Sequence, residues 1–341
     1  MQHHKLAFAI LLATGGAIIL NPHVAHAALS VCKSGCDYTD IQDAVTDAPD
    51  GEVIRIRQGV FTGPISIENK NLTLKGDGSS LTIIDRGPPV DSHAPPTINI
   101  SCTSSHKIII SNVTISGGTP FQHFEGGGGL VNENCDVTLT NTLITNNTRR
   151  GGGGIGNNGK MVVKNSVISG NAAELGGGGI DNQGELSIID SFIVGNSTTT
   201  PGKGGGIVND GTLEVKSSTI TENHGPDGGG FANAVGGIAR LIDTIIINNT
   251  SFGEGGGLWN VSNLELKRSL VIGNTAETQS GGGIYQKAGG NLKMTDSTLI
   301  NNSTATTGGG LYAEGTVTAN IKTIIQGNTP DNCAGGVFLC P

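Results

Sequence analysis

The sequence predicts an all-β fold, a right-handed parallel β-helix in which three short strands per coil stack on their equivalents in the next coil. Glycine supplies 56 of the 341 residues, far above the usual ~7%. Two signatures recur in phase about every 26 residues, and short apolar runs separated by turn residues lie between them. Together these observations indicate one repetitive solenoid domain rather than two ordinary domains.

The two signatures form columns of eight members each. In the first, Gly-Gly-Gly precedes an apolar residue, and the apolar members are Leu130, Ile155, Ile180, Ile207, Phe231, Leu258, Ile284 and Leu311. In the second, an apolar residue and two further residues precede Asn147, Asn171, Asn196, Asn223, Asn249, Asn274, Asn302 and Asn328. We expect the apolar members of the first column to form one row in the hydrophobic interior, because equivalent residues of stacked coils lie side by side.

Each repeat contains three short apolar runs. Between residues 176 and 196 they are Ile180–Asn182, Leu186–Ile188 and Phe192–Val194. Each run is too short for a helix, and turn residues separate the runs, which predicts three strands. Propeller blades need four strands in ~40–50 residues, so the smaller unit favours a solenoid.

Close stacking explains the glycine and asparagine columns. Coils lie ~4.8 Å apart, so a side chain at a tight turn meets its counterpart in the next coil. Glycine avoids this collision, whereas asparagine tolerates left-handed backbone at a bend and can hydrogen-bond to the next asparagine. We predict a structural ladder at Asn132, Asn157, Asn182, Asn209, Asn233 and Asn260.

The first residues have the pattern of an export signal. Lys5 precedes the apolar run Leu6–Leu20, and Ala25-His26-Ala27 matches a small-x-small cleavage site. We therefore expect a signal peptide over residues 1–27 and a protein that is secreted or held at the cell surface. No later stretch is apolar and long enough to span a membrane.

Three further segments are expected in the mature chain. Residues 28–50 are predicted to form an N-terminal cap, because Tyr38–Ala48 has helical spacing of apolar residues and Pro49 ends it. Such a cap would cover the open end of the stack. The parallel β-helix is expected over residues 51–330, followed by a cysteine-containing tail at 331–341.

Six cysteines in an exported chain predict three disulfides, which can pair in 15 ways. Proximity in the sequence favours Cys32 with Cys36 and Cys333 with Cys340, which leaves Cys102 for Cys135. None of these pairs has the spacing of a zinc site.

The formal net charge of −8 and the lack of a basic stripe exclude nucleic acid as an expected partner. The partner that we expect is a polysaccharide or a cell-surface glycan.

Two resemblances to known families add to these expectations. The segments Tyr38–Val45, Gly59–Phe61 and Leu72–Gly78 resemble the start of pectin-lyase-like β-helices, including pectin methylesterases. The two repeated signatures resemble those of polymorphic outer membrane proteins, although an aliphatic residue stands where that family usually has phenylalanine. The first resemblance implies the β-helix and a link to polysaccharide enzymes, and the second implies an adhesin-like surface protein.

Motifs for polysaccharide cleavage are incomplete. Polygalacturonases resemble one another in Asn-Thr-Asp and Asp-Asp motifs that this sequence lacks, and Asn223-His224-Gly225 is only similar to their Gly-His-Gly. A lyase would need calcium and a basic residue. Asp227 and Glu254 precede the glycine triplets of consecutive coils, so they are weak catalytic candidates together with His224. We expect no cofactor, with Ca²⁺ required only if the protein is a lyase.

One outward-facing column predicts a binding site. The residue after the apolar anchor is Trp259, Tyr285 and Tyr312 in three consecutive coils, and strand alternation places it outside if the anchor points inside. An exposed aromatic strip suits sugar rings, whereas a stack that only stabilises the sheet is the structural alternative. The sequence therefore predicts a non-catalytic, adhesin-like or polysaccharide-contacting protein. The alternative is a lyase or hydrolase of acidic, pectin-like glycans with a divergent site.

Overall fold

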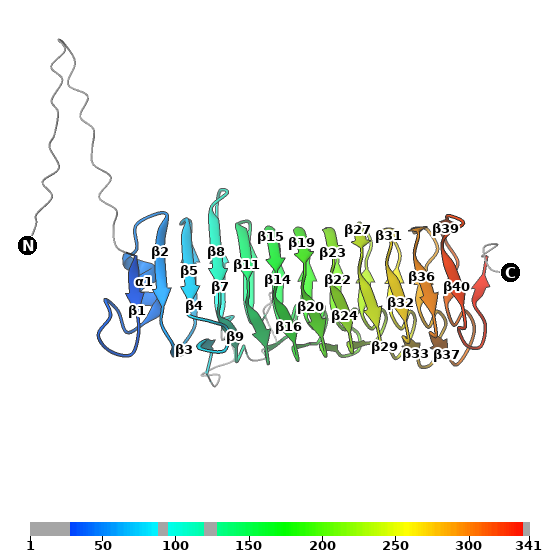
Figure 1. The fold of residues 1–341 in the computed structure, drawn as a ribbon, viewed down its shortest axis with the longest axis horizontal. Helices are drawn as coiled ribbons and strands as arrows, with labels where there is room; N and C mark the ends of the chain where they lie inside the picture. Colours follow the sequence, from blue (N-terminus) through cyan, green and yellow to red (C-terminus); the bar gives the residue numbers. More distant parts are fainter. Residues whose placement is uncertain (1–27, 88–94, 119–127, 337–341) are drawn as a thin grey trace, which may run out of the picture.

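Residues 28–87, 95–118 and 128–336 are described in the computed structural model of the protein. In these ranges the strands stack along one axis into an elongated solenoid, with β1 and α1 at one end and β40 at the other (Figure 1). Neighbouring strands run parallel in all four sheets. The predicted all-β parallel solenoid is therefore confirmed, whereas the expected signal peptide at residues 1–27 lies outside the described residues.

Three sheets extend along the stack, and their strands follow one another in chain order. Sheet A contains β1 (Leu29–Val31), β2 (Glu52–Ile56), β5 (Leu72–Gly76), β8 (Lys107–Ser111), β11 (Asp136–Thr140), β15 (Lys160–Lys164), β19 (Glu185–Ile189), β23 (Thr212–Lys216), β27 (Ile238–Ile242), β31 (Asn263–Lys267), β35 (Asn291–Thr295) and β39 (Thr316–Ala319). Sheet B contains β3 (Gly59–Thr62), β6 (Thr82–Asp85), β9 (Thr114–Ser116), β12 (Leu143–Thr145), β16 (Val167–Ser169), β20 (Phe192–Val194), β24 (Thr219–Thr221), β28 (Ile245–Ile247), β32 (Leu270–Ile272), β36 (Thr298–Ile300) and β40 (Ile324–Gln326). Sheet C contains β4 (Ile65–Glu68), β7 (Ile98–Ser101), β10 (Leu130–Glu133), β14 (Ile155–Asn157), β18 (Ile180–Asn182), β22 (Ile207–Asn209), β26 (Phe231–Asn233), β30 (Leu258–Asn260), β34 (Ile284–Gln286), β38 (Leu311–Ala313) and β41 (Cys333–Gly335).

A fourth sheet changes the expected count of strands per coil. Sheet D contains the two-residue strands β13 (Thr148–Arg149), β17 (Ala172–Ala173), β21 (Ser197–Thr198), β25 (His224–Gly225), β29 (Thr250–Ser251), β33 (Thr275–Ala276) and β37 (Ser303–Thr304). A regular coil thus passes through sheets C, A, B and D before a glycine-rich loop returns it to sheet C. Two-residue strands are too short to produce a periodic pattern, so the prediction of three strands omitted them.

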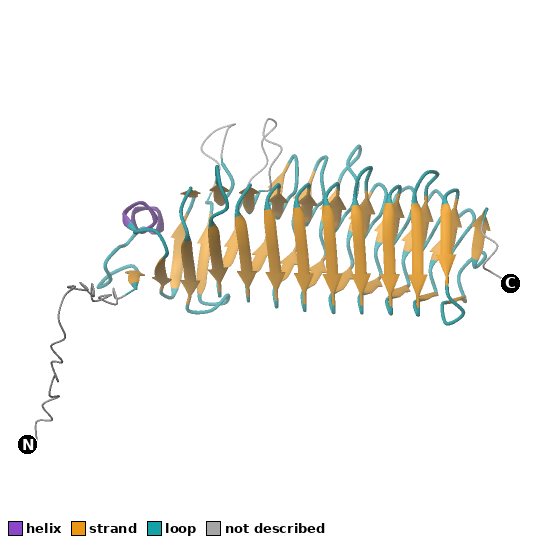
Figure 2. Cartoon of the chain, turned by 90° about the horizontal axis from the view of Figure 1, so that it is seen from above, coloured by secondary structure: helices purple, strands orange, loops and turns teal. Residues whose placement is uncertain are grey.

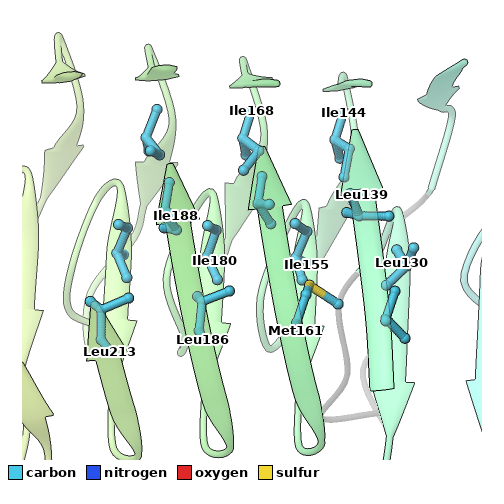
Figure 3. Close-up of a cluster of buried hydrophobic side chains, with 14 of the residues drawn as sticks. Leu130, Leu139, Ile144, Ile155, Met161, Ile168, Ile180, Leu186, Ile188 and Leu213 are labelled. Atoms are coloured by element: carbon cyan, nitrogen blue, oxygen red, sulfur yellow. The ribbon is translucent and has the colours of Figure 1, made fainter. Parts of the chain in front are cut away.

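In each regular coil the apolar interior receives two side chains from sheet A, such as Leu186 and Ile188, and one each from sheets C and B, such as Ile180 and Ile193. Figure 3 shows Leu130, Ile155 and Ile180 of sheet C facing side chains of sheets A and B. The predicted row Ile155, Ile180, Ile207, Phe231, Leu258, Ile284 and Leu311 is in register and fully buried. Identical register from coil to coil lets aliphatic side chains stack on one another, which stabilises the solenoid by burying apolar surface.

Two ladders of buried asparagines run along the corners of the coils. The amide of Asn132 donates to Asn157, and equivalent bonds of 2.7–2.9 Å continue through Asn182, Asn209 and Asn233 to Asn260. A second ladder runs from Asn147 to Asn328. The left-handed residue at this second corner is the one before the ladder asparagine, as at Asn146 and Asn248, with φ of 55° and 54°. The expectation that the ladder asparagines themselves adopt this conformation was therefore wrong.

The helix α1 (Ile41–Asp47) lies at the N-terminal end of the stack (Figure 2). It is shorter than predicted because the Asp40 carboxylate caps it, accepting hydrogen bonds from the backbone of Gln42 and Asp43 at 2.6 and 3.3 Å. The helix buries Ile41, Ala44 and Val45 near strands β1, β2 and β4. The strand β1, which pairs with β2, was not predicted.

Lys70 binds the C-terminal end of α1. Its ammonium group donates to the carbonyl oxygens of Val45, Thr46 and Ala48 at 2.8, 3.2 and 2.7 Å. We expect Lys70→Met to lower the free energy of unfolding by roughly 1–2 kcal/mol, because carbonyls at a helix end lose a charged donor. Urea denaturation followed by circular dichroism measures this, with Lys75→Met on the exposed side of β5 as the matched control. Equal midpoints for the two variants would contradict the role of Lys70.

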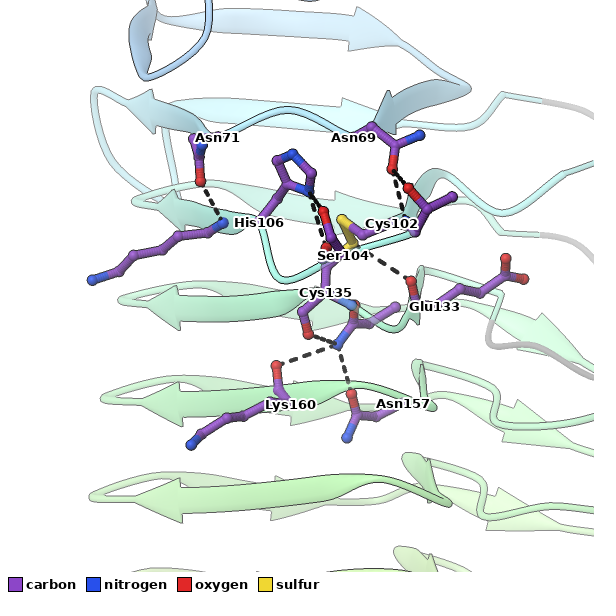
Figure 4. Close-up of a disulfide and its surroundings, with 12 residues drawn as sticks. Asn69, Asn71, Cys102, Ser104, His106, Glu133, Cys135, Asn157 and Lys160 are labelled. Carbon is purple, nitrogen blue, oxygen red and sulfur yellow. Dashed lines mark hydrogen bonds between the residues drawn. A yellow bond between two sulfur atoms is a disulfide. The ribbon is translucent and has the colours of Figure 1, made fainter.

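Two disulfides lie in the described residues. Cys32 pairs with Cys36 and Cys102 with Cys135, with Cα atoms 5.6 and 5.3 Å apart. The second bond joins the segments that follow β7 and precede β11 (Figure 4). The backbone N–H of Cys135 donates a 3.2 Å hydrogen bond to the side chain of Asn132, where the first ladder begins. The expected partner of Cys333, Cys340, lies outside the described residues. No helix in the described ranges is long and apolar enough to cross a membrane.

Candidate functional site

The candidate site lies on the outer face of sheet C. The predicted column is present there, because Val208, Ala232, Trp259, Tyr285 and Tyr312 pair from coil to coil. The expected exposure is wrong: Trp259 and Tyr285 have only 4% and 5% of their surface exposed. Together with Val208 and Ala232 they form a second buried cluster that is separate from the interior of the solenoid, and Tyr312 packs against it half-buried.

The glycine-rich loops explain why the outer column is covered. Gly255 has a φ of +64°. A Cβ at this position would collide with the carbonyl oxygen of Leu258 and lie 3.1 Å from the backbone nitrogen of Trp259. At Gly308, with a φ of +70°, a Cβ would lie 2.7 Å from the Cβ of Tyr312. The first glycine of each triplet therefore lets the loop lie directly on the column, and any larger residue would hold it away.

Two lysines and two acids surround Trp259. The Lys203 ammonium lies 3.5 Å from the centroid of the indole and 3.9 Å from the Asp227 carboxylate. The Lys287 ammonium lies 5.6 Å from the same centroid and 3.6 Å from Glu254, and Glu254 accepts a 2.8 Å hydrogen bond from the indole N–H. Burial lowers the pKa of Lys203, and the Asp227 carboxylate opposes this shift. The cation–π contacts and ion pairs fix the charged groups on the aromatic surface.

Tyr285 and Tyr312 continue the cluster toward the C-terminal end. Their rings stack with centroids 5.1 Å apart and an angle of 20°. The Tyr285 hydroxyl donates a 2.7 Å hydrogen bond to Glu314. Burial, and then this hydrogen bond to a carboxylate, raises the pKa of Tyr285 far above its ordinary value. The phenol therefore stays a proton donor at any physiological pH.

Of the three weak catalytic candidates, the structure brings Asp227 and Glu254 together and places His224 in another sheet. Asp227 accepts a 3.0 Å hydrogen bond from the backbone of Glu254 and pairs with Lys203. Glu254 is held by Trp259 and Lys287. His224 lies in β25 of sheet D with an exposed side chain, away from sheet C. Among the described residues no group of three or more His, Cys, Asp or Glu side chains could hold a metal ion.

A cavity of about 200 Å³ opens on the same outer face, N-terminal to the aromatic cluster. Its lining side chains are Arg150, Leu175, Asp181, Gln183, Val208 and Asp210. Asp181 and Val208 belong to the outer column itself, and they pair across β18 and β22. Partial desolvation raises the pKa of Asp210, and the positive charge of Lys203 lowers it. Lys203 of the aromatic cluster is therefore close enough to the cavity to act on the charge of Asp210.

Sequence reasoning missed Gln183, Asp210, Lys287 and Glu314. Each directly follows the inward-facing ladder position of its coil, so strand alternation would have placed it outward. This second outward column was the available signal.

No protein-family model and no curated protein matches the sequence. Among solved structures, the chain is similar to the pectate lyase Pel9A, with 12% identity over 91% of this chain and 82% of the other, at a TM-score of 0.46. It is also similar to the catalytic unit of a GH87 α-1,3-glucanase from Streptomyces thermodiastaticus, with 15% identity, coverage of 90% and 70% and a TM-score of 0.42. The pectin methylesterase PemA from Erwinia chrysanthemi shows 13% identity, coverage of 85% and 80% and a TM-score of 0.38. Because all three TM-scores lie below 0.5, the fold assignment rests on the sheet topology and not on these likenesses.

Proposed function

We propose that this protein is an extracellular, non-catalytic β-helix that binds a glycan along the outer face of sheet C. The observation that carries the proposal is that two features lie on one face. One is the cavity, and the other is an aromatic cluster that holds charged groups of both signs in fixed positions. Hydroxyl groups of a sugar chain both donate and accept hydrogen bonds, so alternating ammonium and carboxylate groups match them. The disulfides are consistent with an oxidising, extracellular environment.

The non-catalytic part of the proposal rests on how the acids of the aromatic cluster are engaged. Asp227, Glu254 and Glu314 each accept hydrogen bonds from groups that hold the fold together. A general acid or base must exchange its proton with substrate, and a carboxylate committed to an indole or a phenol is poorly placed to do so.

A polysaccharide hydrolase or lyase is the second candidate. The observation that favours it is the presence of Asp181 and Asp210 on one cavity, with the pKa of Asp210 raised by burial. Two carboxyl groups in different environments are the usual equipment for glycoside hydrolysis.

A polysaccharide panel tests the proposal and separates the two candidates. The full chain is passed over immobilised neutral, acidic and amino-sugar polymers, and the eluate is assayed for reducing ends and unsaturated products. We expect retention on at least one polymer without product release. Retention on none would contradict glycan binding, whereas released product would establish the enzyme.

Tyr312 is the half-buried ring at which the binding face can be tested without opening the buried part of the cluster. We expect Tyr312→Ala to weaken retention about fivefold, because one aromatic contact contributes about 1 kcal/mol. The matched control is Phe192→Ala, which removes a 51% exposed ring from the outer face of sheet B. If both variants, or neither, lose retention while their urea midpoints equal that of the parent, the contact surface is not on sheet C.

A further inference from the structure

We propose that the cavity lined by Asp181, Gln183 and Asp210 binds one positively charged amino-sugar unit, so that the ligand of sheet C is a cationic glycan. This inference rests on the proposed function and names its ligand class.

The size of the cavity limits what it can hold. A volume of about 200 Å³ is below the roughly 300–1,000 Å³ of pockets for drug-sized ligands, so one ring-sized unit of a chain is the natural occupant. The side chains of Leu175 and Val208 supply apolar surface for a ring face. A Cβ at Gly176 would lie 2.6 Å from the Asp181 carboxylate. Any residue larger than glycine at this position would therefore push the carboxylate out of its position on the cavity wall.

The charges of the lining favour a cation. Two carboxylates, Asp181 and Asp210, share the cavity with one guanidinium, that of Arg150. Farther along the face, Lys203 and Lys287 are already paired with Asp227 and Glu254, while Glu314 adds one more carboxylate. Acidic side chains therefore outnumber basic ones on this face. In addition, the net charge of −8 of the whole chain attracts cations over longer distances and repels uronic-acid polymers.

Asp210 is the residue that would gain most from such a ligand. Asp210 is exposed as a residue, so a ligand can reach its carboxylate. Partial desolvation raises the pKa of this carboxyl group, and the charge of Lys203 opposes that shift. Among the described residues no hydrogen bond reaches the carboxylate. A partly desolvated carboxylate without a donor is stabilised by an ammonium group that arrives with the ligand. Gln183, on the same wall, can donate to and accept from the neighbouring hydroxyl groups of the sugar.

The test compares the full chain on a glucosamine polymer, on the same polymer after N-acetylation, and on polygalacturonate. We expect retention on the glucosamine polymer to be at least tenfold stronger than on its N-acetylated form, since acetylation removes the positive charge. Asp210→Asn should lose about tenfold on the glucosamine polymer, as expected when a hydrogen bond between charged groups is replaced by a neutral one. Free glucosamine should compete with the polymer for the parent protein.

The matched control is Asp190→Asn, at a left-handed corner between sheets A and B that asparagine also tolerates. It should retain the parent's affinity. Equal retention of the charged and N-acetylated polymers, or an unchanged Asp210→Asn variant, would overturn the inference and leave glycan binding standing. Failure to bind any polymer would overturn both proposals together.

Discussion

Replacing Asn157 by alanine is expected to destabilise the protein by roughly 3–5 kcal/mol, because several buried polar groups lose their partners at once and each costs ~1–3 kcal/mol. Asn157 is fully buried. Its amide donates to Asn182, Glu185 and Gly159, and its oxygen accepts from Asn132 at 2.8 Å. Alanine breaks the ladder in both directions.

The neighbouring residue supplies the control. Asn158 is exposed, and its backbone N–H donates a hydrogen bond to Asn132 of the coil before it. Asn158→Ala keeps that bond, so we expect a change within about 0.5 kcal/mol. Urea denaturation followed by circular dichroism compares the two variants. Similar midpoints for both would mean that the ladder contributes little to stability, for instance because water replaces the lost amide.

Stacking made the register of the coils predictable from sequence. Residues of one type that recur at each coil, such as Ile155, Ile180 and Ile207, lie in contact in the structure, so the repeat itself encodes which side chains meet. The asparagine columns carry the same information, because a buried amide requires a partner of matching geometry in the next coil.

The burial of Trp259 and Tyr285 was not predicted, for a physical reason. Strand alternation tells which face of a sheet a side chain points to, but not whether a loop covers that face. The covering loop was nevertheless visible in the sequence, because Gly255 and Gly308 are glycines that permit contact between a loop and the outer column. From the sequence alone, tight turns between coils are a sufficient explanation of the triplets, so the covering loop is not required by the pattern.

The charged part of the candidate site was predicted only in fragments. Asp227 and Glu254 were recognisable as one column of the repeat, but Lys287 belongs to a different column and reaches Glu254 through its long side chain. A contact between residues at different positions of the repeat depends on the conformations of their side chains and not on the repeat length. Only the three-dimensional structure shows such ion pairs.

Replacing Val45 of helix α1 by aspartate is expected to cause association of the protein. Val45 is 3% exposed and packs with Ile41 and Ala44 in the continuous core of the solenoid. A carboxylate cannot be buried there without a partner, so the helix must shift away from the stack. The coil beneath it would then expose apolar side chains and unpaired strand edges, which recruit other chains.

A point change is preferable to deleting Tyr38–Ala48, because deletion would also displace β1 from β2. The control is Thr46→Asp, which places the same charge on the exposed side of the helix. Light scattering should show oligomers for Val45→Asp and a monomer-sized species for Thr46→Asp, and the urea midpoint should fall only for the first. If Val45→Asp stays the size of the parent and unfolds at the same urea concentration, α1 does not protect the N-terminal end of the solenoid.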